Sequence, residues 1–277
     1  MGIFEGAILL CDIDGTLLES GVIPQKNIDK INFFISEGGR FSIATGRNLA
    51  GFSNVINAIP KMSPSVVSNG CIIYDYNAKE ILYERVLDKC DYRFANDVLN
   101  SELNCGIEIH SGERVFTLSR TKETDDHQRD QQLETTEITF EEANKIKWNK
   151  VIYLLNSAND YDKINQIINK EESNSSFLNV CTFIDGTKRN YLEQTLLGTT
   201  KQVAIERLCD ILKIKDGKRF AIGDYYNDLT MLINADISAT TAEAPDEIKQ
   251  ETDFVGGSCK NGAVADFIDY LTEIFTN

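Results

Sequence analysis

The stretch Ile8-Leu9-Leu10-Cys11-Asp12-Ile13-Asp14-Gly15-Thr16-Leu17 decides the fold of this chain. An apolar run of strand length ends in two carboxylates one residue apart. In an open α/β sheet, ligands bind at the carboxyl ends of the strands, so this segment predicts two acids at a functional site. Alternate residues of a strand point to the same side, so Asp12 and Asp14 are expected to share one face.

Two carboxylates held this close repel each other unless a cation or a shared proton intervenes. A hard divalent ion with oxygen ligands, Mg²⁺ in particular, is the expected partner. A calcium loop is excluded because it needs Asp or Asn at the fifth position and Glu at the twelfth, where Thr16 and Ile23 stand. Asp-Gly is also a common turn, and this segment alone leaves that alternative open.

The composition is that of an ordinary globular protein, with 42% hydrophobic and 26% charged residues in 277. That length predicts two domains. The net charge of -15 argues against nucleic acid and anionic membrane as partners. We also expect no membrane span, because no apolar run approaches about 20 residues.

The seven cysteines are dispersed, and none stands in a Cys-x-x-Cys pair, which argues against a zinc site. Cys11, Cys71, Cys181 and Cys209 lie in apolar surroundings, where buried reduced thiols are expected. The N-terminus lacks a basic segment and a cleavage site, so a signal peptide is not expected. Together these features predict a cytoplasmic protein.

The two ends of the chain alternate predicted strands and helices, which indicates a parallel sheet. The predicted elements near the N-terminus are 7–12, 25–36, 41–44, 48–59 and 65–68. Those near the C-terminus are 200–212, 219–223, 228–234, 236–239, 253–255 and 263–275. The fold class is therefore α/β, with a Rossmann-like parallel-sheet core formed by residues 1–80 and 195–277.

The middle of the chain, residues 81–194, predicts an inserted α+β domain whose strands are paired and half-exposed. A hairpin is expected from 106–110 and 114–118 around Ser111-Gly112-Glu113, with further strands at 151–155, 177–183 and 190–193. Helices are expected at 88–103 and 161–170. The polar stretch 120–137 predicts an exposed loop. His110, in a strand, is expected to be structural.

The ends of the predicted core strands carry polar groups suited to phosphoryl transfer. They are Asp12, Asp14, Thr45, Arg47, Asn69, Asp224, Asn227 and Asp228, with Lys201 at the start of a helix. A carboxylate can attack phosphorus and divide the reaction into two easier steps. Mg²⁺, lysine and hydroxyl or amide donors can stabilise the charge on the transferring oxygens. Thr45-Gly46 offers a hydroxyl and a backbone N–H at the start of a helix, which is an anion site.

The motifs of the core resemble those of the haloacid dehalogenase superfamily, and the place of the insert resembles its Cof-type sugar-phosphatase branch. The matching segments are Asp12-Ile13-Asp14-Gly15-Thr16-Leu17, Ala44-Thr45-Gly46-Arg47, Ser68-Asn69-Gly70, Lys201 and Gly223-Asp224-Tyr225-Tyr226-Asn227-Asp228. The resemblance covers essentially the whole chain. It implies that the insert, residues 81–194, is a cap domain that closes over the catalytic site.

The resemblance also implies roles for single residues. Asp12 would be the nucleophile that forms an aspartyl-phosphate, and Asp14 the general acid and base. Mg²⁺ would bind the carboxylates of Asp12 and Asp224 and the backbone carbonyl of Asp14. Thr45, Gly46, Lys201 and Asn227 would hold the phosphate, with Arg47, Asn69 and Asp228 in support.

Two segments depart from the family pattern. Tyr225 and Tyr226 stand where a small residue is usual, which would narrow the site. The run Ala239–Ala244 replaces a Gly-Asn-Ala run, which leaves a supporting loop on the phosphate side unassigned. Six residues of the expected cap could touch a sugar or a second phosphate, but the sequence assigns none of them that role; they are Glu113, Arg114, Lys122, His127, Trp148 and Arg189.

The sequence thus predicts a Mg²⁺-dependent phosphoric monoester hydrolase that acts on a small phosphorylated metabolite, most simply a sugar phosphate. Two alternatives stay open at this point. A phosphomutase would use the same aspartyl-phosphate and protect it from water. A metabolite sensor would bind without catalysis, although a binding module has no need of both Asp12 and Asp14.

Overall fold

A computed structural model describes residues 2–19, 21–49, 51, 57–59, 61–155, 157–168, 173–184, 187–214 and 218–276. Side chains are described in these ranges except at 158–159, 181–184 and 187–190. The chain divides into two compact units. Unit 1 contains residues 1–47, 52–83 and 200–277, and unit 2 contains 48–51 and 84–199.

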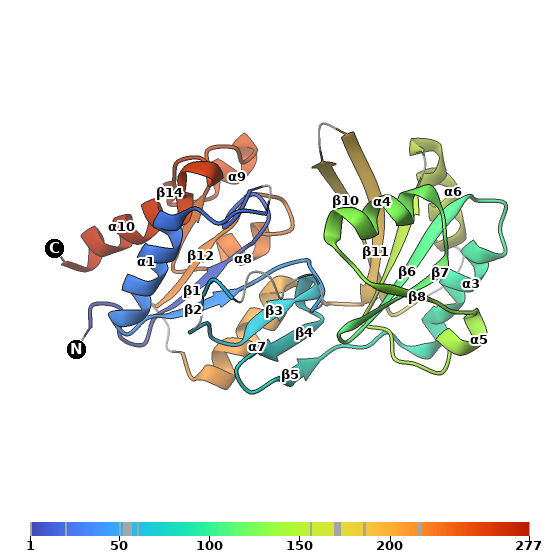
Figure 1. Ribbon diagram of the computed structural model, residues 1–277, viewed down its shortest axis with the longest axis horizontal. Helices are drawn as coiled ribbons and strands as arrows, with labels where there is room; N and C mark the ends of the chain where they lie inside the picture. Colours follow the sequence, from blue (N-terminus) through green and yellow to red (C-terminus); the bar gives the residue numbers. More distant parts are fainter. Residues whose placement is uncertain are drawn as a thin grey trace. The chain divides into compact units, whose positions relative to one another are not determined.

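Unit 1 is built on a five-stranded parallel sheet in the order β14-β13-β12-β1-β2 (Figure 1). Its strands are β1 (Ile8–Cys11), β2 (Arg40–Ile43), β12 (Arg219–Ile222), β13 (Ile237–Thr240) and β14 (Phe254–Val255). All four residues of β1 are apolar and buried, as a central strand covered on both faces requires. The predicted parallel α/β core is confirmed.

Helices cover both faces of this sheet. One face packs against α1 (Gln25–Ser36) and α10 (Ala263–Thr276) through a cluster that includes Leu9, Phe34 and Phe267. The other face packs against α7 (Lys201–Leu212), α8 (Leu229–Ile233) and α9 (Asp246–Gln250). The helical period that the sequence shows at 25–36 and 200–212 therefore corresponds to real helices with one buried side.

The strand predicted at 65–68 does not extend the parallel ladder. A single parallel bridge, Ala44–Val66, joins β3 (Ser65–Val67) to the end of β2. β3 pairs instead in an antiparallel sheet with β4 (Ile72–Asp75), beside β5 (Glu80–Glu84). The cause is a tight turn in which Ser68, Asn69 and Gly70 all adopt positive φ (53°, 54° and 99°), which reverses the chain.

Unit 2 is a six-stranded, mostly antiparallel sheet in the order β10-β11-β9-β6-β7-β8 (Figure 1). The strands are β6 (Cys105–Ser111), β7 (Arg114–Ser119), β8 (Thr135–Glu137), β9 (Lys150–Leu155), β10 (Ser175–Ile184) and β11 (Thr187–Leu196). The helices are α3 (Arg93–Leu99), α4 (Lys122–Gln131), α5 (Phe140–Ala143) and α6 (Ala158–Ile168). One face of the sheet packs on α3 and α6 through Tyr153, Ile107 and Phe94.

The predicted loop at 120–137 is wrong, because this segment forms helix α4 and strand β8. Thr121 caps the helix by accepting a hydrogen bond from the Thr124 N–H, and the Thr124 hydroxyl accepts one from the Thr121 N–H. This reciprocal capping, with acidic residues in the first turn, stabilises a helix that has almost no apolar residues. Its buried residues are Thr124 and His127.

Other predictions need smaller adjustments. The helix predicted at 88–103 is a 3₁₀ turn at Lys89–Tyr92 followed by α3, and six of the twelve residues in the helix predicted at 48–59 lie outside the described residues. Cys11, Cys71 and Cys209 are buried free thiols, whereas the side chain of Cys181 is not among those described. Within the described ranges, none of the helices is both long enough and apolar enough to cross a membrane.

Candidate active site

Two neighbouring parallel strands deliver their acids to the same edge of the unit 1 sheet. Cys11 of β1 lies opposite Ile222 of β12, so the residues that follow both strands emerge together. The Asp12 N–H donates to the Ile222 carbonyl at 3.0 Å, which fixes Asp12 at the carboxyl end of β1. Gly223 and Asp224 follow Ile222. This arrangement is the one that the strand-end rule predicts.

Three carboxylates meet here, and we call Asp12, Asp224 and Asp228 the acidic cluster. One carboxylate oxygen from each lies within 4.8 Å of the others. Asp12 and Asp228 are buried, and Asp224 is half-buried. Asp14, whose carboxylate also follows β1, is not part of this cluster.

Lys201 lies between two members of the cluster. Its Nζ is 2.7 Å from Asp12 Oδ1 and 2.6 Å from Asp228 Oδ1, and the side chain is buried. Lys201 is the first residue of α7, whose N-cap Thr200 accepts a hydrogen bond from the Val203 N–H at 3.2 Å. The cap sets where the helix begins and therefore where the lysine stands.

Asp228 is the anchor of the loop that carries Asp224. Its Oδ2 accepts hydrogen bonds from the backbone N–H groups of Asp224 (3.1 Å) and Tyr225 (3.3 Å), while Oδ1 binds Lys201. Glycine is required at 223, because a Cβ there would lie 2.6 Å from the Asp228 side chain. The Gly-Asp-x-x-Asn-Asp spacing is thus explained by the Asp228 carboxylate, which accepts hydrogen bonds from the backbone of its own loop.

The electrostatics of the cluster show an excess of negative charge. Burial raises the pKa of Asp12 well above its ordinary value, and the charge of Asp228 adds to the increase although Lys201 opposes it. Burial and the charge of Asp228 raise the pKa of Asp224 to about 7, against a hydrogen bond from Thr16. Burial acts to lower the pKa of Lys201, but Asp12 and Asp228 outweigh it and raise that pKa, so Lys201 is a cation.

A divalent cation fits this donor set. Carboxylate oxygens are the ligands that Mg²⁺ prefers, and Lys201 alone does not offset three acids, two of which are buried. The raised pKa of Asp224 is the effect expected of a carboxylate that lacks a sufficient positive partner. The acidic cluster is therefore the candidate metal site. It contains Asp12 and Asp224, whose carboxylates are predicted ligands, and Asp228, which the sequence assigned a supporting role.

Asp14 is held by Arg47 instead. Arg47 Nε donates to Asp14 Oδ2 at 2.7 Å, and Nη2 donates to Oδ1 at 2.6 Å. The Arg47 N–H also donates to the Thr45 hydroxyl at 3.1 Å, and Thr45 is buried at the end of β2. The structure thus brings together the predicted phosphate-binding segment Thr45-Gly46 and the predicted acid and base.

Asn69 lies against Gly46. The position that a Gly46 Cβ would take is 3.0 Å from Asn69 Oδ1, so a larger residue at 46 would displace the amide. The Asn69 N–H donates to the Thr45 carbonyl at 3.0 Å, and the Ser68 N–H donates to the Arg47 carbonyl at 2.8 Å. These bonds hold a backbone of costly positive φ in place, as is common near functional sites.

The Asn227 side chain is less well connected. It is half-buried in the turn between Asp224 and Asp228, but no hydrogen bond joins it to another predicted site residue in the part of the chain that the structure describes. Tyr225 and Tyr226 are exposed, with rings in an edge-on contact 5.0 Å apart. They therefore project from the loop that carries Asp224.

Sequence reasoning missed Thr16. Its hydroxyl donates to Asp224 Oδ1 at 3.0 Å, although the two residues are 208 positions apart. This hydrogen bond orients a cluster carboxylate from within the first motif. The only sequence signal was the place of Thr16 in the Asp-x-Asp-Gly-Thr segment, and the structure adds that Thr16 is fully buried.

Two of the residues considered for substrate contact are buried in unit 2. Trp148 is fully buried and stacks on Tyr92, with ring centroids 3.7 Å apart. His127 Nδ1 lies 2.7 Å from the buried Glu108 carboxylate. These contacts assign Trp148 and His127 a structural role within unit 2. The side chain of Arg189 is not among those described.

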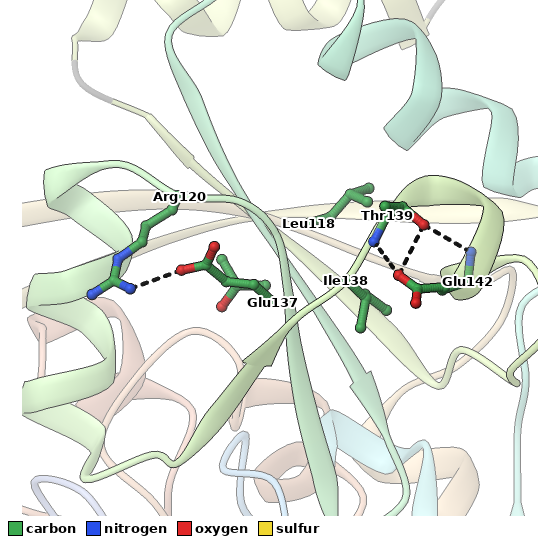
Figure 2. Close-up of a pocket in the computed structure, with 7 residues that line it drawn as sticks. Leu118, Arg120, Glu137, Ile138, Thr139 and Glu142 are labelled. Carbon is green, nitrogen blue, oxygen red and sulfur yellow. Dashed lines mark hydrogen bonds and ion pairs between the residues drawn. The ribbon is translucent and has the colours of Figure 1, made fainter.

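Unit 2 also has an open cavity of about 270 Å³ beside β7 and β8, which Figure 2 shows. Arg120 spans from Asp125 to Glu137, with hydrogen bonds of 2.7 and 2.8 Å. On the other side, Thr139 and Glu142 cap α5. None of the predicted site residues lines this cavity.

Comparison with known proteins places this geometry in context. The model of the haloacid dehalogenase-like hydrolase family matches residues 9–268. The chain is 26% identical to the 5-amino-6-(5-phospho-D-ribitylamino)uracil phosphatase YwtE of Bacillus subtilis, over 94% of this chain and 96% of that protein. It is 23% identical to YcsE, a phosphatase of the same name from that organism, over 90% and 88%.

The fold has similar solved structures as well. A haloacid dehalogenase-like hydrolase from B. subtilis superposes with a TM-score of 0.80, covering 96% of this chain and 99% of the other at 20% identity. At this identity the likeness concerns the fold, and it extends over both units of the chain.

Proposed function

Because this chain belongs to the family of haloacid dehalogenase-like hydrolases and is an enzyme of the phosphatase kind, we propose that it hydrolyses a small phosphorylated metabolite, a sugar or sugar-alcohol phosphate, through an aspartyl-phosphate on Asp12 with Mg²⁺ as cofactor. The observation that carries this proposal is the acidic cluster. Three carboxylates with oxygens within 4.8 Å, two of them bridged by a buried lysine, stand at the ends of neighbouring parallel strands.

In the first step, an Asp12 carboxylate oxygen attacks phosphorus, and the bond from phosphorus to the ester oxygen breaks. The leaving oxygen takes a proton from Asp14. This step needs the nucleophilic carboxylate to be ionised and the acid carboxylate to be protonated. Lys201, 2.7 Å from Asp12 Oδ1, favours the ionised form of the nucleophile and can stabilise charge on the transferring phosphoryl group.

In the second step, water attacks the phosphorus of the aspartyl-phosphate and gives a proton to Asp14. Phosphate leaves, and the Asp12 carboxylate is restored. Thr45, Gly46 and Asn227 are proposed to hold the phosphate oxygens, with Asn69 in support through its contact with Gly46. Mg²⁺, held by Asp12, Asp224 and the Asp14 carbonyl with Asp228 nearby, would neutralise negative charge at the phosphoryl group.

The substrate class rests on two supports. The motif set resembles that of Cof-type sugar phosphatases, and two relatives are named as phosphatases of a ribityl phosphate, which is a primary alkyl phosphomonoester. An alkyl alkoxide is a poor leaving group, so hydrolysis of such an ester benefits from a general acid. We further propose that unit 2 acts as the cap, with boundaries near the predicted 81–194, and that the protein works in the cytoplasm.

The test is release of inorganic phosphate from a panel of hexose, pentose and ribityl phosphates, nucleotides and 4-nitrophenyl phosphate, with Mg²⁺ and with EDTA. We expect release that needs Mg²⁺ and is abolished in Asp12→Asn. Asp130→Asn, a carboxylate change on α4 of unit 2, is the matched control and should stay active.

Either of two results would contradict the proposal. One is full activity in EDTA or in Asp12→Asn. The other is conversion of a sugar phosphate to its isomer without release of phosphate, which would establish a mutase. Binding of a phosphorylated metabolite with neither reaction would establish a sensor.

A further inference from the structure

Arg47 stands at the junction of three loops of the candidate site. Its guanidinium binds the segment that follows β1, through two hydrogen bonds to Asp14. Its N–H binds the Thr45 hydroxyl after β2, and its carbonyl accepts the Ser68 N–H after β3. No single motif predicts this role, because the three segments are far apart in the sequence.

The contact with Asp14 uses both oxygens of the carboxylate. Two parallel bonds of 2.6 and 2.7 Å from one guanidinium fix the plane and the direction of the carboxylate, which a single bond cannot do. The Asp14 side chain is otherwise open, with 52% of its surface exposed, whereas Arg47 is 20% exposed. The backbone of Asp14 is fixed separately by a bridge to Leu18, so Arg47 controls the side-chain direction.

A structural role explains little of this arrangement. An ion pair with an exposed partner contributes little to stability. The Asp14 carboxylate is held by Arg47 and is not among the three acids of the cluster.

We propose that Arg47 is a positioning residue that orients the Asp14 carboxylate for proton transfer to the leaving oxygen, and that it does not act as a ligand of the phosphate. This inference rests on the proposed function of Asp14 as general acid. A general acid must lie within hydrogen-bond reach of the oxygen that it protonates, and such catalysis contributes about 10²- to 10⁴-fold to rate. Loss of the guanidinium would let Asp14 rotate away from that geometry.

Two roles of Arg47, orienting Asp14 and binding the phosphate, can be told apart by changing the leaving group of the substrate. An alkyl phosphate such as a hexose 6-phosphate needs its leaving oxygen protonated, whereas 4-nitrophenyl phosphate expels a stable phenolate without that help. The constant kcat/KM reports the steps up to formation of the aspartyl-phosphate. We expect Arg47→Met to lower kcat/KM for the alkyl phosphate at least about tenfold more than for the aryl phosphate.

The controls test the same distinction between alkyl and aryl phosphates. Asp14→Asn should show the same dependence on the leaving group, and Arg47→Met should add little to it in the double variant, because both changes remove one function. Arg47→Lys keeps the charge but cannot make two parallel bonds, so it should keep most of the defect. Arg120→Met removes an arginine of unit 2 that hydrogen-bonds to Asp125 and to Glu137, the second of which Figure 2 shows, and should leave both constants unchanged.

An equal loss of kcat/KM for both substrates would overturn the inference, since it would mean that Arg47 binds the phosphate itself. An additive loss in the double variant would overturn it as well. If the wild type hydrolyses neither ester with Mg²⁺, the proposed function fails and the inference fails with it. If Arg47→Met does not fold, as judged by its melting profile, the same comparison is made with Arg47→Lys.

Discussion

Both units of this protein bury charged side chains, but they balance those charges differently. In unit 2, Lys150 pairs with Glu193 at 2.9 Å, and the imidazole of His127 lies 2.7 Å from Glu108, so each of these two carboxylates has its own partner. In unit 1, Lys201 contacts two carboxylates, and Asp224 lies beside them. Paired charges such as these are part of the folded structure, whereas an excess of charges of one sign indicates a site for a ligand of the opposite charge.

This difference between the two units predicts that the largest effect on activity comes from changing the nucleophile, Asp12. Asp12→Asn should lower phosphatase activity by about 10⁴-fold or more, as expected when a nucleophile is removed. The same change should leave stability unchanged or increase it, because the fold disfavours the charged form of Asp12, whose pKa is raised by burial and by Asp228. Steady-state kinetics and calorimetric melting measure the two effects. A large loss of stability in Asp12→Asn would show that the cluster is a structural one.

For the balanced pair Lys150–Glu193 of unit 2, we expect the opposite: removing one partner should lower stability. Lys150→Met leaves Glu193 charged and buried, which should lower the free energy of unfolding by about 3–5 kcal/mol. The double variant Lys150→Met with Glu193→Leu removes both charges and should recover most of that loss. Urea unfolding followed by the fluorescence of Trp148, the one tryptophan of the chain and buried in unit 2, measures this directly.

In that experiment, equal destabilisation in the single and the double variants would contradict the account. It would mean that the pair itself, rather than the lone buried carboxylate, determines the stability of unit 2.

Adding Mg²⁺ should stabilise unit 1, because the ion binds the folded cluster. At 100 times the dissociation constant the gain is about 2.7 kcal/mol. The gain should grow with pH. The pKa of Asp224 is raised to about 7, above its value in the unfolded chain, so the metal-free fold holds an extra proton below that pH and loses this stabilisation as the pH rises through it.

The metal competes with that proton, so its binding strengthens as Asp224 ionises. Calorimetric melting with and without Mg²⁺, at about pH 6 and about pH 8, measures the difference, and Asp224→Asn should reduce its pH dependence. A Mg²⁺ effect that is the same at both pH values would mean that Asp224 does not titrate in this window.

The smallest effect concerns His110 of unit 2. Among the described residues neither of its ring nitrogens has a hydrogen-bond partner, and burial together with the charge of Lys150 lowers its pKa well below the ordinary value. The unfolded chain therefore binds the proton more readily, so acidification below about pH 6.5 should destabilise unit 2, by about 1.4 kcal/mol for each unit of pKa difference.

His110→Gln removes the titrating group and should flatten this dependence. The measurement is the difference in unfolding free energy between the wild type and His110→Gln, followed by Trp148 fluorescence across this pH range. A difference that does not change with pH would contradict the buried neutral histidine.

The sequence predicted unit 1 better than unit 2, for a physical reason. In unit 1, apolar strands end abruptly in polar residues, and a parallel sheet brings those ends together, so Asp12, Asp224 and Asp228 could be placed near one another. Lys201 followed from its position at a helix start. The bond from Thr16 to Asp224 was not predicted, because its direction depends on side-chain geometry.

In unit 2, the sequence predicts half-exposed strands and a loop at 120–137, whereas Glu108 of β6 is fully buried. The segment is helix α4, and its residues His127 and Gln128 bind the two oxygens of Glu108 at 2.7 and 2.8 Å. Capping by Thr121 and Thr124, rather than apolar periodicity, forms this helix, so a search for apolar stripes could not find it.

The most direct test of the central claim is to find the phosphoryl group on the enzyme. Asp14→Asn is expected to slow attack by water on the intermediate, so this variant is mixed with 4-nitrophenyl phosphate and Mg²⁺, quenched in acid and digested for mass spectrometry. The account predicts a phosphoryl group on Asp12 in the peptide that contains Cys11–Gly15, and none in Asp12→Asn. Release of nitrophenol without any phosphorylated Asp12, or with the phosphoryl group on another residue, would contradict it.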